Sequence, residues 1–536
     1  MVSAVDSIAT GAARMRRWFA VLGPLLVGVI VVALIRPGLL PGIGYWDTGE
    51  FQTILPIMGT AHPTGYPTYV LIGWAVNLML APLGESAFRM NVLSLLCVAV
   101  AGALTVHLVA RLTGRVLIGM AAGLAVALGP ATWRIATHAD PHTLHLAFVA
   151  ALLVLLVRWE QARRSIRPTA DRWLIAASVV FGLSVGNHSL TLLLAVPVGL
   201  YVLSVEPAIL LRPRLMATCV LALVGTVVAV YLELPLRAGP FRAPLVYGAP
   251  DTWTGFWYVT LAEQFRGSVI DPLGELPRKI ADLTRLASAE FGYLTPLIPV
   301  GFVATAVRHG RYALLTGSAM AITLLFNASY ANADISRYYL GPSLWVWTWL
   351  AVLAGVIVEQ VAGSPADLEA GAEDETGQPG TPAWWHPARL GAALLTMSLA
   401  GLLVVPTLAG LRVRAELADS SHDTAARQWV SAVLADVEPD AVIVSWWSRS
   451  TVLWYAQFVD HQRPDVMVID DRTRLDLDYG EATDVIARFL GSRPVYVIRA
   501  NAYDLRKVSD LFDLAPVGGP TTTNLYRVLG PRSAGG

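Results

Sequence analysis

The chain has 536 residues, of which 55% are hydrophobic and only 15% are charged, and its mean hydropathy is +0.55. An ordinary soluble domain is about 45 to 50% apolar and about 25% charged, so the composition excludes a soluble enzyme, a disordered chain and a collagen-like repeat. The 39 Lys and Arg residues balance the 39 Asp and Glu residues, which excludes the basic footprint of a nucleic-acid-binding protein. The two cysteines, Cys97 and Cys219, lie inside apolar runs, so they offer neither a disulfide framework nor metal-ligand spacing.

We expect eleven membrane spans, because a spanning helix needs about 20 apolar residues. The expected spans are residues 18–36, 90–110, 116–133, 143–158, 172–187, 190–205, 215–236, 293–307, 312–328, 339–361 and 389–411. The run from Tyr66 to Leu83 is also apolar, but counting it as a span would invert the charge pattern of every later loop. We therefore expect it to lie in the membrane surface or to be re-entrant.

Arginine-rich turns predict the orientation in the membrane. They lie at residues 14–17, 111–115, 158–172, 212–214 and 308–311. With the spans above, all of these turns fall on one side, which the positive-inside rule makes cytoplasmic. The sequence therefore predicts an α-helical, polytopic protein of the plasma (inner) membrane, with its N-terminus in the cytoplasm and its C-terminal region outside.

Composition divides the chain into two domains. The predicted membrane domain covers residues 1–411 and contains a first outer loop at 37–89, a long outer loop at 237–292 and a flexible linker at 362–388 rich in Gly, Pro and acidic residues. Residues 412–536 resemble a small soluble α/β domain, with strands expected at 441–445, 466–469 and 494–498. This outer domain lacks glycine-rich nucleotide-binding motifs. Trp446 and Trp447 follow its first strand and face either a sugar ring or, as is more common, an interface with the membrane domain.

The first outer loop carries two carboxylates, Asp47 and Glu50, three residues apart. This spacing puts them on one face of a short helix. One interpretation is structural, with one residue capping the helix and the other complementing its dipole. The other is chemical, with a general base or half of a divalent-metal site, and the spacing does not separate the two.

Further polar groups gather in the other outer segments. His138, Asp140 and His142 have no strong metal-ligand signature and are better interpreted as a polar rim that hydrogen-bonds a phosphate or a sugar. His188 lies near the outer end of a span, where the headgroup region can satisfy it. The candidate cations for an anionic headgroup or pyrophosphate are Arg237, Arg242 and Arg266 in the long outer loop and Arg337 in a later outer turn.

Three motifs, WDTGEF, AHPTGYPTY and FRMN, follow one another over residues 46–91. In this order they resemble the signature of bacterial membrane proteins related to the eukaryotic plexin-modifying protein O-mannosyltransferase, in the GT-C glycosyltransferase superfamily. The resemblance extends through GLSVGNH at 182–188, LPLR at 234–237 and RPDVMVID at 463–470. Two positions depart from the family pattern: Thr64 replaces a second proline, and HADPH at 138–142 replaces an acidic motif.

The resemblance implies a glycosyltransferase that takes a sugar, such as mannose, from a polyprenyl-phosphate donor and transfers it to a hydroxyl of a protein or glycan acceptor at the outer membrane face. The family's catalytic acid of the first outer loop corresponds to Asp47, with Glu50 as a second matching carboxylate. His62, Tyr66 and Arg89 match motif positions expected to line the site.

The expected chemistry needs a base for the acceptor hydroxyl and cationic or hydrogen-bonding groups for the departing phosphate. We expect Asp47 as the base, Glu50 as a supporting carboxylate or, with Asp47, a ligand of a divalent metal, and Arg89, Arg337 and His188 on the phosphate. A single displacement at the anomeric carbon would invert its configuration.

Two other functional classes fit a chain of this kind. A secondary transporter also has many spans and intramembrane polar residues, but its usual internal repeat is not seen in this sequence. A non-catalytic membrane scaffold with an outer binding domain is the second alternative. If Asp47, Arg89, Asp140 and Arg337 do not converge on one outward cavity, the enzyme interpretation loses most of its support.

Overall fold

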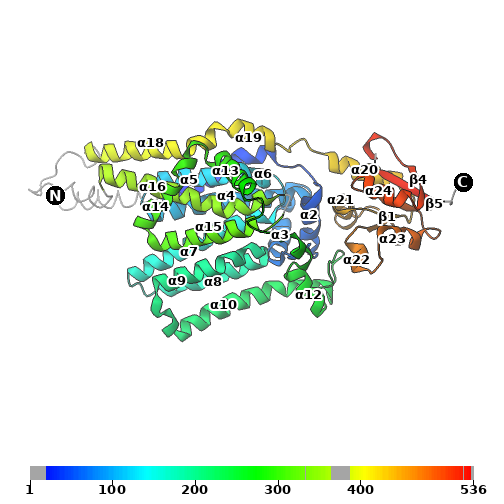
Figure 1. Ribbon diagram of the computed structural model, residues 1–536, viewed down its shortest axis with the longest axis horizontal. Helices are drawn as coiled ribbons and strands as arrows, with labels where there is room; N and C mark the ends of the chain where they lie inside the picture. Colours follow the sequence, from blue (N-terminus) through cyan, green and yellow to red (C-terminus); the bar gives the residue numbers. More distant parts are fainter. Residues whose placement is uncertain (1–19, 332–333, 364–386, 523, 533–536) are drawn as a thin grey trace, which may run out of the picture.

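The computed structural model describes residues 20–331, 334–363, 387–522 and 524–532. A bundle of roughly parallel helix axes forms one part of the molecule, and a small domain with a sheet projects from one end of it (Figure 1). The linker predicted at 362–388 falls almost wholly outside the described residues.

The membrane domain is helical throughout its described length. After the helix Ala20–Gly38, its helices are α2 (Trp46–Ile57), α3 (Pro67–Met79), α4 (Ser86–Thr113), α5 (Val116–Ala127), α6 (Pro130–Ala136), α7 (Pro141–Arg164), α8 (Ala170–Asn187), η3 (Ser189–Leu194), α9 (Ala195–Val205), α10 (Pro213–Tyr231), α11 (Glu233–Ala238), α12 (Trp253–Thr260), α13 (Leu276–Phe291), α14 (Ile298–Arg308), α15 (Gly310–Ala328), η7 (Ile335–Tyr339), α16 (Leu340–Ala362), α18 (Pro387–Ala409) and α19 (Leu411–Ala418).

Within the described ranges, seven helices are long and apolar enough to cross a membrane, and the bent pair α5 and α6, at 62°, makes up to eight. The chain is therefore an integral, multi-pass membrane protein. The count of eleven spans stays a prediction, because helices such as α8 and α9 occupy expected positions without meeting this length and hydropathy criterion. Helix α3, in the apolar run at 66–83, has 13 residues, so it is about 20 Å long and shorter than the bilayer's hydrocarbon core of about 30 Å.

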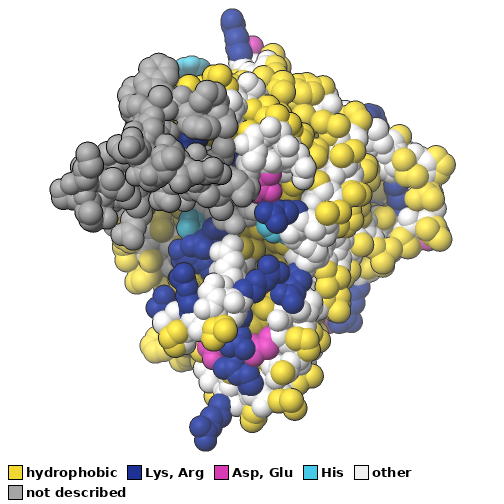
Figure 2. All heavy atoms as spheres, turned by 90° about the vertical axis from the view of Figure 1, so that its left-hand side faces the viewer, with side chains coloured by type: hydrophobic (Ala, Val, Ile, Leu, Met, Phe, Trp, Pro, Cys, Tyr) yellow, Lys and Arg dark blue, Asp and Glu magenta, His cyan; other side chains and the backbone are white. Residues whose placement is uncertain are grey.

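The arginine-rich turns meet at one end of the bundle, where acidic and amide groups connect them. Arg163 and Arg212 both pair with Glu206, and Arg311 lies 3.4 Å from Glu160. Figure 2 looks onto this end and shows Lys and Arg side chains gathered there. The sheet domain lies at the opposite end (Figure 1); which end faces the cytoplasm remains the prediction made from the charges.

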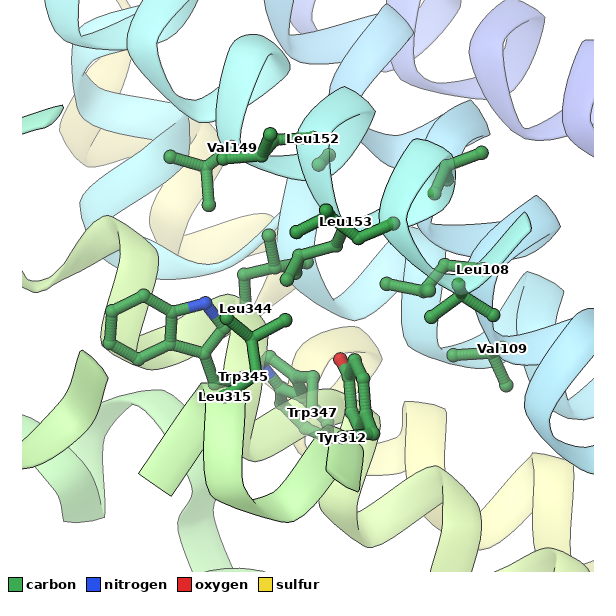
Figure 3. Close-up of a cluster of buried hydrophobic side chains, with 14 of the residues drawn as sticks. Leu108, Val109, Val149, Leu152, Leu153, Tyr312, Leu315, Leu344, Trp345 and Trp347 are labelled. Carbon is green, nitrogen blue, oxygen red and sulfur yellow. The ribbon is translucent and has the colours of Figure 1, made fainter. Parts of the chain in front are cut away.

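A buried apolar cluster holds the bundle together. Figure 3 shows its centre, where side chains from α4, α7, α15 and α16 meet. Two polar groups inside it are hydrogen-bonded: the Tyr312 hydroxyl lies 2.9 Å from Thr348 Oγ1, and Trp349 Nε1 donates to Thr316 Oγ1 at 2.9 Å. Since the bilayer core offers no water to unpaired polar groups, these bonds let the bundle act as a rigid base for its outer loops.

The outer domain contains helices around a mixed sheet. Its helices are α20 (Ala425–Asp436), α21 (Trp447–Phe458), α22 (Thr473–Asp476), α23 (Ala482–Phe489) and α24 (Ala502–Ser509), and its strands are β1 (Val442–Val444), β2 (Met467–Ile469), β3 (Val495–Ile498), β4 (Phe512–Pro516) and β5 (Leu525–Pro531). The strand order is β2-β1-β3-β5-β4. Strand β1 is parallel to both neighbours, with Val442 opposite Met467 and Val495, and β5 is antiparallel to β3 and β4. The first three strands confirm the predicted ones, whereas β4 and β5 were not predicted from the sequence.

The outer domain docks on the first outer loop through helices α2 and α21. Phe51 and Ile54 of α2 share one buried cluster with Val452 and Trp454 of α21. Around this cluster, the Tyr455 hydroxyl accepts a hydrogen bond from the backbone N–H of Ala87 at 3.0 Å. The shared cluster fixes the outer domain over the end of the bundle.

A glycine of the WDTGEF motif permits this docking. A Cβ atom at Gly49 would lie 2.4 Å from the carbonyl oxygen of Gly44 and 2.8 Å from Thr451 Oγ1 of α21. Both contacts are shorter than a side-chain carbon tolerates, and one of them is to backbone. Gly49 therefore sets the distance between α2 and α21.

We expect Gly49→Ala to lower the free energy of unfolding by about 1–3 kcal/mol, the usual cost of overpacking a buried contact. Gly225→Ala in α10 is the matched control, because a Cβ there meets no described atom within 4 Å. Thermal unfolding in detergent, followed by tryptophan fluorescence, compares the two variants. Equal midpoints for Gly49→Ala and wild type would contradict the assigned role of Gly49.

Candidate active site

A large cavity lies where the outer end of the bundle meets the outer domain, with a volume of about 960 Å³. Its walls come from the first outer loop, the start of α7, the break between α8 and η3, the long outer loop, η7 and the outer domain. Its lining includes Trp46, Asp47, His62, Tyr66, His142, His188, Phe265, Arg266, Asp334, Arg337, Tyr338, Trp447, Asp470, Asp471 and Arg472. Five of the residues predicted from the sequence as substrate-binding, together with Asp47, therefore share one cavity.

Asp47 lies in the first turn of α2 and faces the cavity, with 40% of its side chain exposed. Its Oδ1 accepts a hydrogen bond of 3.1 Å from Trp447 Nε1 of the outer domain. Its Oδ2 lies 3.8 Å from Arg337 Nη1. The residue at the N-cap of α2 is Tyr45, and its side chain forms no capping bond with the described residues. The structure thus places Asp47 in contact with the cavity rather than in the cap of α2.

Glu50 lies behind the cavity wall and is fully buried. Its Oε1 accepts from the backbone N–H of His62 at 2.7 Å, and its Oε2 lies 2.5 Å from His62 Nδ1. When Nδ1 donates to Glu50, Nε2 of His62 accepts from the Tyr66 hydroxyl at 3.2 Å. Glu50 was predicted as a catalytic carboxylate, but its contacts make it a residue that positions His62, because both of its oxygens are occupied away from the cavity.

Burial and this contact change the acidity of the pair. Burial raises the pKa of Glu50, and the neighbouring His62 offsets part of the rise. Burial alone would lower the pKa of His62, but the charge and hydrogen bond of Glu50 outweigh it and raise that pKa above its ordinary value. His62 is thereby held as a hydrogen-bonding group at the cavity wall.

Asp140 and His142 form a second buried pair at the start of α7. Asp140 is the N-cap of α7, and its Oδ1 accepts from the backbone N–H of His142 and lies 2.8 Å from His142 Nδ1. Burial would raise the pKa of Asp140, but the charge of Arg337 and the contacts with His142 hold it well below its usual range. The ring of His142 lies 4.7 Å from that of His188, and its Nε2 has no hydrogen-bond partner among the described residues. His142 borders the cavity, although this nitrogen is itself buried.

Arg337 joins the three carboxylates of the site. In the described residues its guanidinium lies 3.3 Å from Asp140, 3.8 Å from Asp47 and 2.7 Å from Asp334. Asp334 also pairs with Arg134 at 2.6 Å. Since these acids come from three separate segments, Arg337 ties the first loop, α7 and η7 together at the cavity.

Four predicted site residues, Glu50, Arg89, Asp140 and Arg237, are not in the cavity lining, and of these Arg89 and Arg237 contact backbone carbonyl groups. Arg89 Nε donates to the carbonyl of Gly84 at 2.8 Å, and its Nη1 to the carbonyl of Asn77 at 3.2 Å. Arg237 donates to the carbonyls of Ile57 and Met58 at 2.8 and 2.9 Å, and so satisfies the end of α2. Each guanidinium is therefore occupied by backbone carbonyl groups, and the structure does not bring these two arginines to the cavity.

The donor set does not favour the divalent-metal site suggested for Asp47 and Glu50. Among the described residues, no group of three or more His, Cys, Asp and Glu side chains is arranged to hold a metal ion. Glu50 directs both oxygens to His62, whereas Asp47 faces Trp447 and Arg337. The two carboxylates therefore point to different partners.

The outer domain contributes a wall that the sequence did not predict. Asp470, Asp471 and Arg472 follow β2 and line the cavity. Asp470 Oδ1 accepts from the backbone N–H of Thr473 at 2.6 Å, while its Oδ2 has no partner among the residues described. Burial raises the pKa of Asp470 to about 6. The signal was the acidic pair directly after a buried parallel strand, where ligand-binding residues of α/β sheets collect.

We expect acidification to remove the stabilisation that the charged Asp140 gives to the folded protein. A carboxylate whose pKa is depressed in the folded state stabilises the fold above its unfolded pKa of about 4 and loses that contribution as the pH falls towards the folded pKa. We expect the thermal midpoint of the wild type to fall more steeply than that of Asp140→Asn between about pH 5 and pH 3. Asparagine also caps helices, so the comparison isolates the charge. Parallel curves for the two proteins would show that Asp140 carries no such contribution.

The first part of the membrane domain matches a known family. Residues 47–209 match the model of the Protein O-mannosyl-transferase TMEM260 N-terminal domain. The chain is also 34% identical over 235 residues to the mouse (Mus musculus) protein named Protein O-mannosyl-transferase TMEM260, which covers 42% of this chain and 31% of the mouse protein. The chain thus spans about a third of the length of this curated relative.

Solved structures with a similar fold cover nearly the whole chain. The structure of ArnT from Cupriavidus metallidurans bound to undecaprenyl phosphate has a TM-score of 0.56 at 15% identity, covering 97% of this chain and 98% of ArnT. The oligosaccharyltransferase AglB from Archaeoglobus fulgidus, in complex with an inhibitory peptide and a dolichol-phosphate, has a TM-score of 0.51 at 12% identity, covering 97% of this chain and 75% of AglB. The chain therefore shares its fold with ArnT and AglB, and its residues 47–209 are similar to the N-terminal domain of the TMEM260 O-mannosyl-transferase.

Proposed function

We propose that the protein is a glycosyltransferase that moves a sugar from a polyprenyl-phosphate donor to a hydroxyl group of a protein or glycan at the outer face of the membrane. The observation that carries the proposal is the position of Asp47, a partly exposed carboxylate facing a cavity of about 960 Å³ within 3.8 Å of Arg337. A base and a cation side by side are what the transfer of a sugar from a phosphate to a hydroxyl requires.

The relatives support the choice of donor. The ArnT structure contains undecaprenyl phosphate and the AglB structure contains dolichol-phosphate, and both of these lipids are polyprenyl phosphates. The mouse relative is named an O-mannosyl-transferase, which makes mannose the first sugar to test. The charge distribution of the loops supports a site at the outer face of the inner membrane.

Asp47 acts as the general base in this proposal. Its Oδ2 takes the proton of the acceptor hydroxyl while the acceptor oxygen bonds to the anomeric carbon of the donor sugar. The bond from that carbon to the phosphate oxygen breaks, and its electrons go to the phosphate. Trp447 holds the other carboxylate oxygen through its indole N–H, so the base presents one defined oxygen to the acceptor.

Arg337 stabilises the negative charge that develops on the departing phosphate. Its guanidinium is held by Asp140 and Asp334, so it is placed before the donor arrives and needs little rearrangement during the reaction. His142 also borders the cavity, and its ring is held by the contact between Nδ1 and Asp140. Arg89 takes no part in this mechanism, because it braces the turn before α4.

The alternatives are less well supported by this arrangement. Asp47 and Arg337 line one cavity, and the buried Asp140 pairs with Arg337, whereas Arg89 lies outside the cavity lining. A transporter needs a substrate site near the middle of the membrane, whereas the charged groups of this site lie between the bundle end and the outer domain. A scaffold has no need for a buried aspartate of lowered pKa, Asp140, that is paired with an arginine at a cavity.

We expect Asp47→Asn to lower donor turnover by about 10²- to 10⁴-fold, the usual contribution of a general base. The assay measures sugar release from radiolabelled polyprenyl-phosphate sugars by purified protein in nanodiscs. Asp251→Asn is the matched control, since Asp251 is an exposed aspartate of the outer surface outside the cavity lining. A folded Asp47→Asn protein with wild-type turnover would exclude Asp47 as the base.

Direct attack of the acceptor on the donor should invert the anomeric carbon. NMR of the product linkage, compared with the linkage in the donor, measures this outcome. Retention would require a covalent or otherwise two-step route and would rule out the single displacement assigned to Asp47.

A further inference from the structure

A second cavity, of about 450 Å³, lies in the outer domain. It is bordered by Trp446, Asp471, Arg474, Glu481, Ala482, Thr483, Arg499, Ala500, Asp504, Lys507 and Val508. These residues gather around the carboxyl ends of β1, β2 and β3. Strand β1 is paired on one side with β2 and on the other with β3. The chain therefore runs from β1 to β2 in one direction along the sheet and then crosses back to β3 in the opposite direction. Ligands of open α/β sheets bind at such a switch point.

The second cavity adjoins the proposed active site. Asp471 borders both cavities. Trp446 borders the second one, and its ring packs edge-on against that of Trp46, which borders the first, with 5.1 Å between ring centres. A ligand that leaves the vicinity of Asp47 across this pair of rings therefore reaches the second cavity.

Trp46 is held in a costly conformation at this junction. Its φ angle is +61°, in the left-handed region that bulky residues rarely adopt, and 56% of it is exposed. An exposed tryptophan in a strained backbone, next to a proposed catalytic aspartate, points to a binding function because stability alone does not favour it.

The charges of the second cavity balance. Arg499 lies 2.8 Å from Asp471, Arg474 lies 3.2 Å from Glu481 and Lys507 lies 3.7 Å from Asp504. This balance gives no preference for an anion or a cation. Planar carboxylate and guanidinium groups beside an indole ring instead provide both donors and acceptors for hydroxyl groups and a flat apolar face.

The position of Arg499 in this cavity is fixed by its contacts within the protein. The side chain of Arg499 is 7% exposed, and its Nη2 donates to the carbonyl of Ser445 at 2.6 Å. Its Nε has no hydrogen-bond partner within the described part of the chain. A buried donor without a partner is costly, and a hydroxyl-rich ligand would relieve that cost.

We infer that the acceptor is a neutral carbohydrate chain whose reacting hydroxyl lies at Asp47 and whose preceding sugars pack on Trp46 and Trp446 and occupy the second cavity. This inference rests on the proposed glycosyltransferase function and names its acceptor class. The two tryptophan rings supply the apolar faces for sugar rings, and Asp471 and Arg499 hydrogen-bond their hydroxyls.

The test compares fluorescently tagged neutral oligosaccharides of increasing length with Ser/Thr peptides as acceptors. In the wild type, the oligosaccharide KM should fall with length. Trp446→Ala should raise the KM for long oligosaccharides by about tenfold, the effect of losing one aromatic contact, and leave the KM for the donor unchanged. Trp173→Ala is the matched control, because Trp173 lies at the arginine-rich end and packs against Arg158 and Arg172.

Two further measurements separate this inference from the proposed function. Calorimetric titration of the longest oligosaccharide into protein in nanodiscs measures binding without turnover, and Trp446→Ala should weaken it by a similar factor. Release of the sugar to water without any acceptor reports on the catalytic residues alone. Transfer to peptides but not to oligosaccharides, or a Trp446→Ala protein with unchanged KM and binding, would overturn the carbohydrate acceptor while leaving donor turnover intact. Absence of wild-type donor turnover would instead count against the proposed function.

Discussion

One guanidinium, that of Arg337, holds the outer end of this protein together. It contacts carboxylates of the first outer loop, of the start of α7 and of its own turn. Asp140 is 2% exposed, and a buried charge is tolerated when it is paired and hydrogen-bonded. Without Arg337, these acids would repel one another within one cavity wall. The same cation that makes the cluster stable is the group best placed to meet a phosphate, so structure and proposed chemistry depend on a single residue.

The outer domain is part of the candidate site rather than an appendage. Trp447 reaches Asp47 across 400 positions of sequence, and Arg472 Nη2 donates to the Tyr258 hydroxyl of the long outer loop at 3.0 Å. The cavity is thus bounded by two parts of the chain that lie far apart in sequence.

Much of the fold follows from local patterns in the sequence. The apolar runs predicted helices, and the β-branched runs predicted the three parallel strands, because burial on both faces leaves a continuous hydrophobic signal. The missed strands β4 and β5 are only partly buried and contain Asp513, Gly530 and Pro531, so they lack that signal. The carboxylate at Asp47 and the cation at Arg337 were identified from motif and composition.

There is a physical reason why the remaining part of the site could not be predicted from the sequence. Arginine near a helix end can face a ligand or cap backbone carbonyls, and Arg237 does the latter, which its residue type does not reveal. Glu50 lies one helical turn from Asp47, but it contacts a different residue, His62. The contribution of Asp470 and Arg472 depends on how two domains dock, and docking is set by surfaces that no local pattern describes.

Because α2 and α21 share one buried core, the first outer loop forms a structural unit with the outer domain. The boundary between the two parts of this protein is therefore not simply the end of the last membrane helix. Phe51 and Ile54 are covered by α21, so an outer domain exchanged with that of a relative would meet a helix shaped for another surface. The exchangeable unit is the outer domain together with the first outer loop. Recombination between such proteins would then carry the proposed base and its tryptophan partner together, and acceptor preference would change without separating the two.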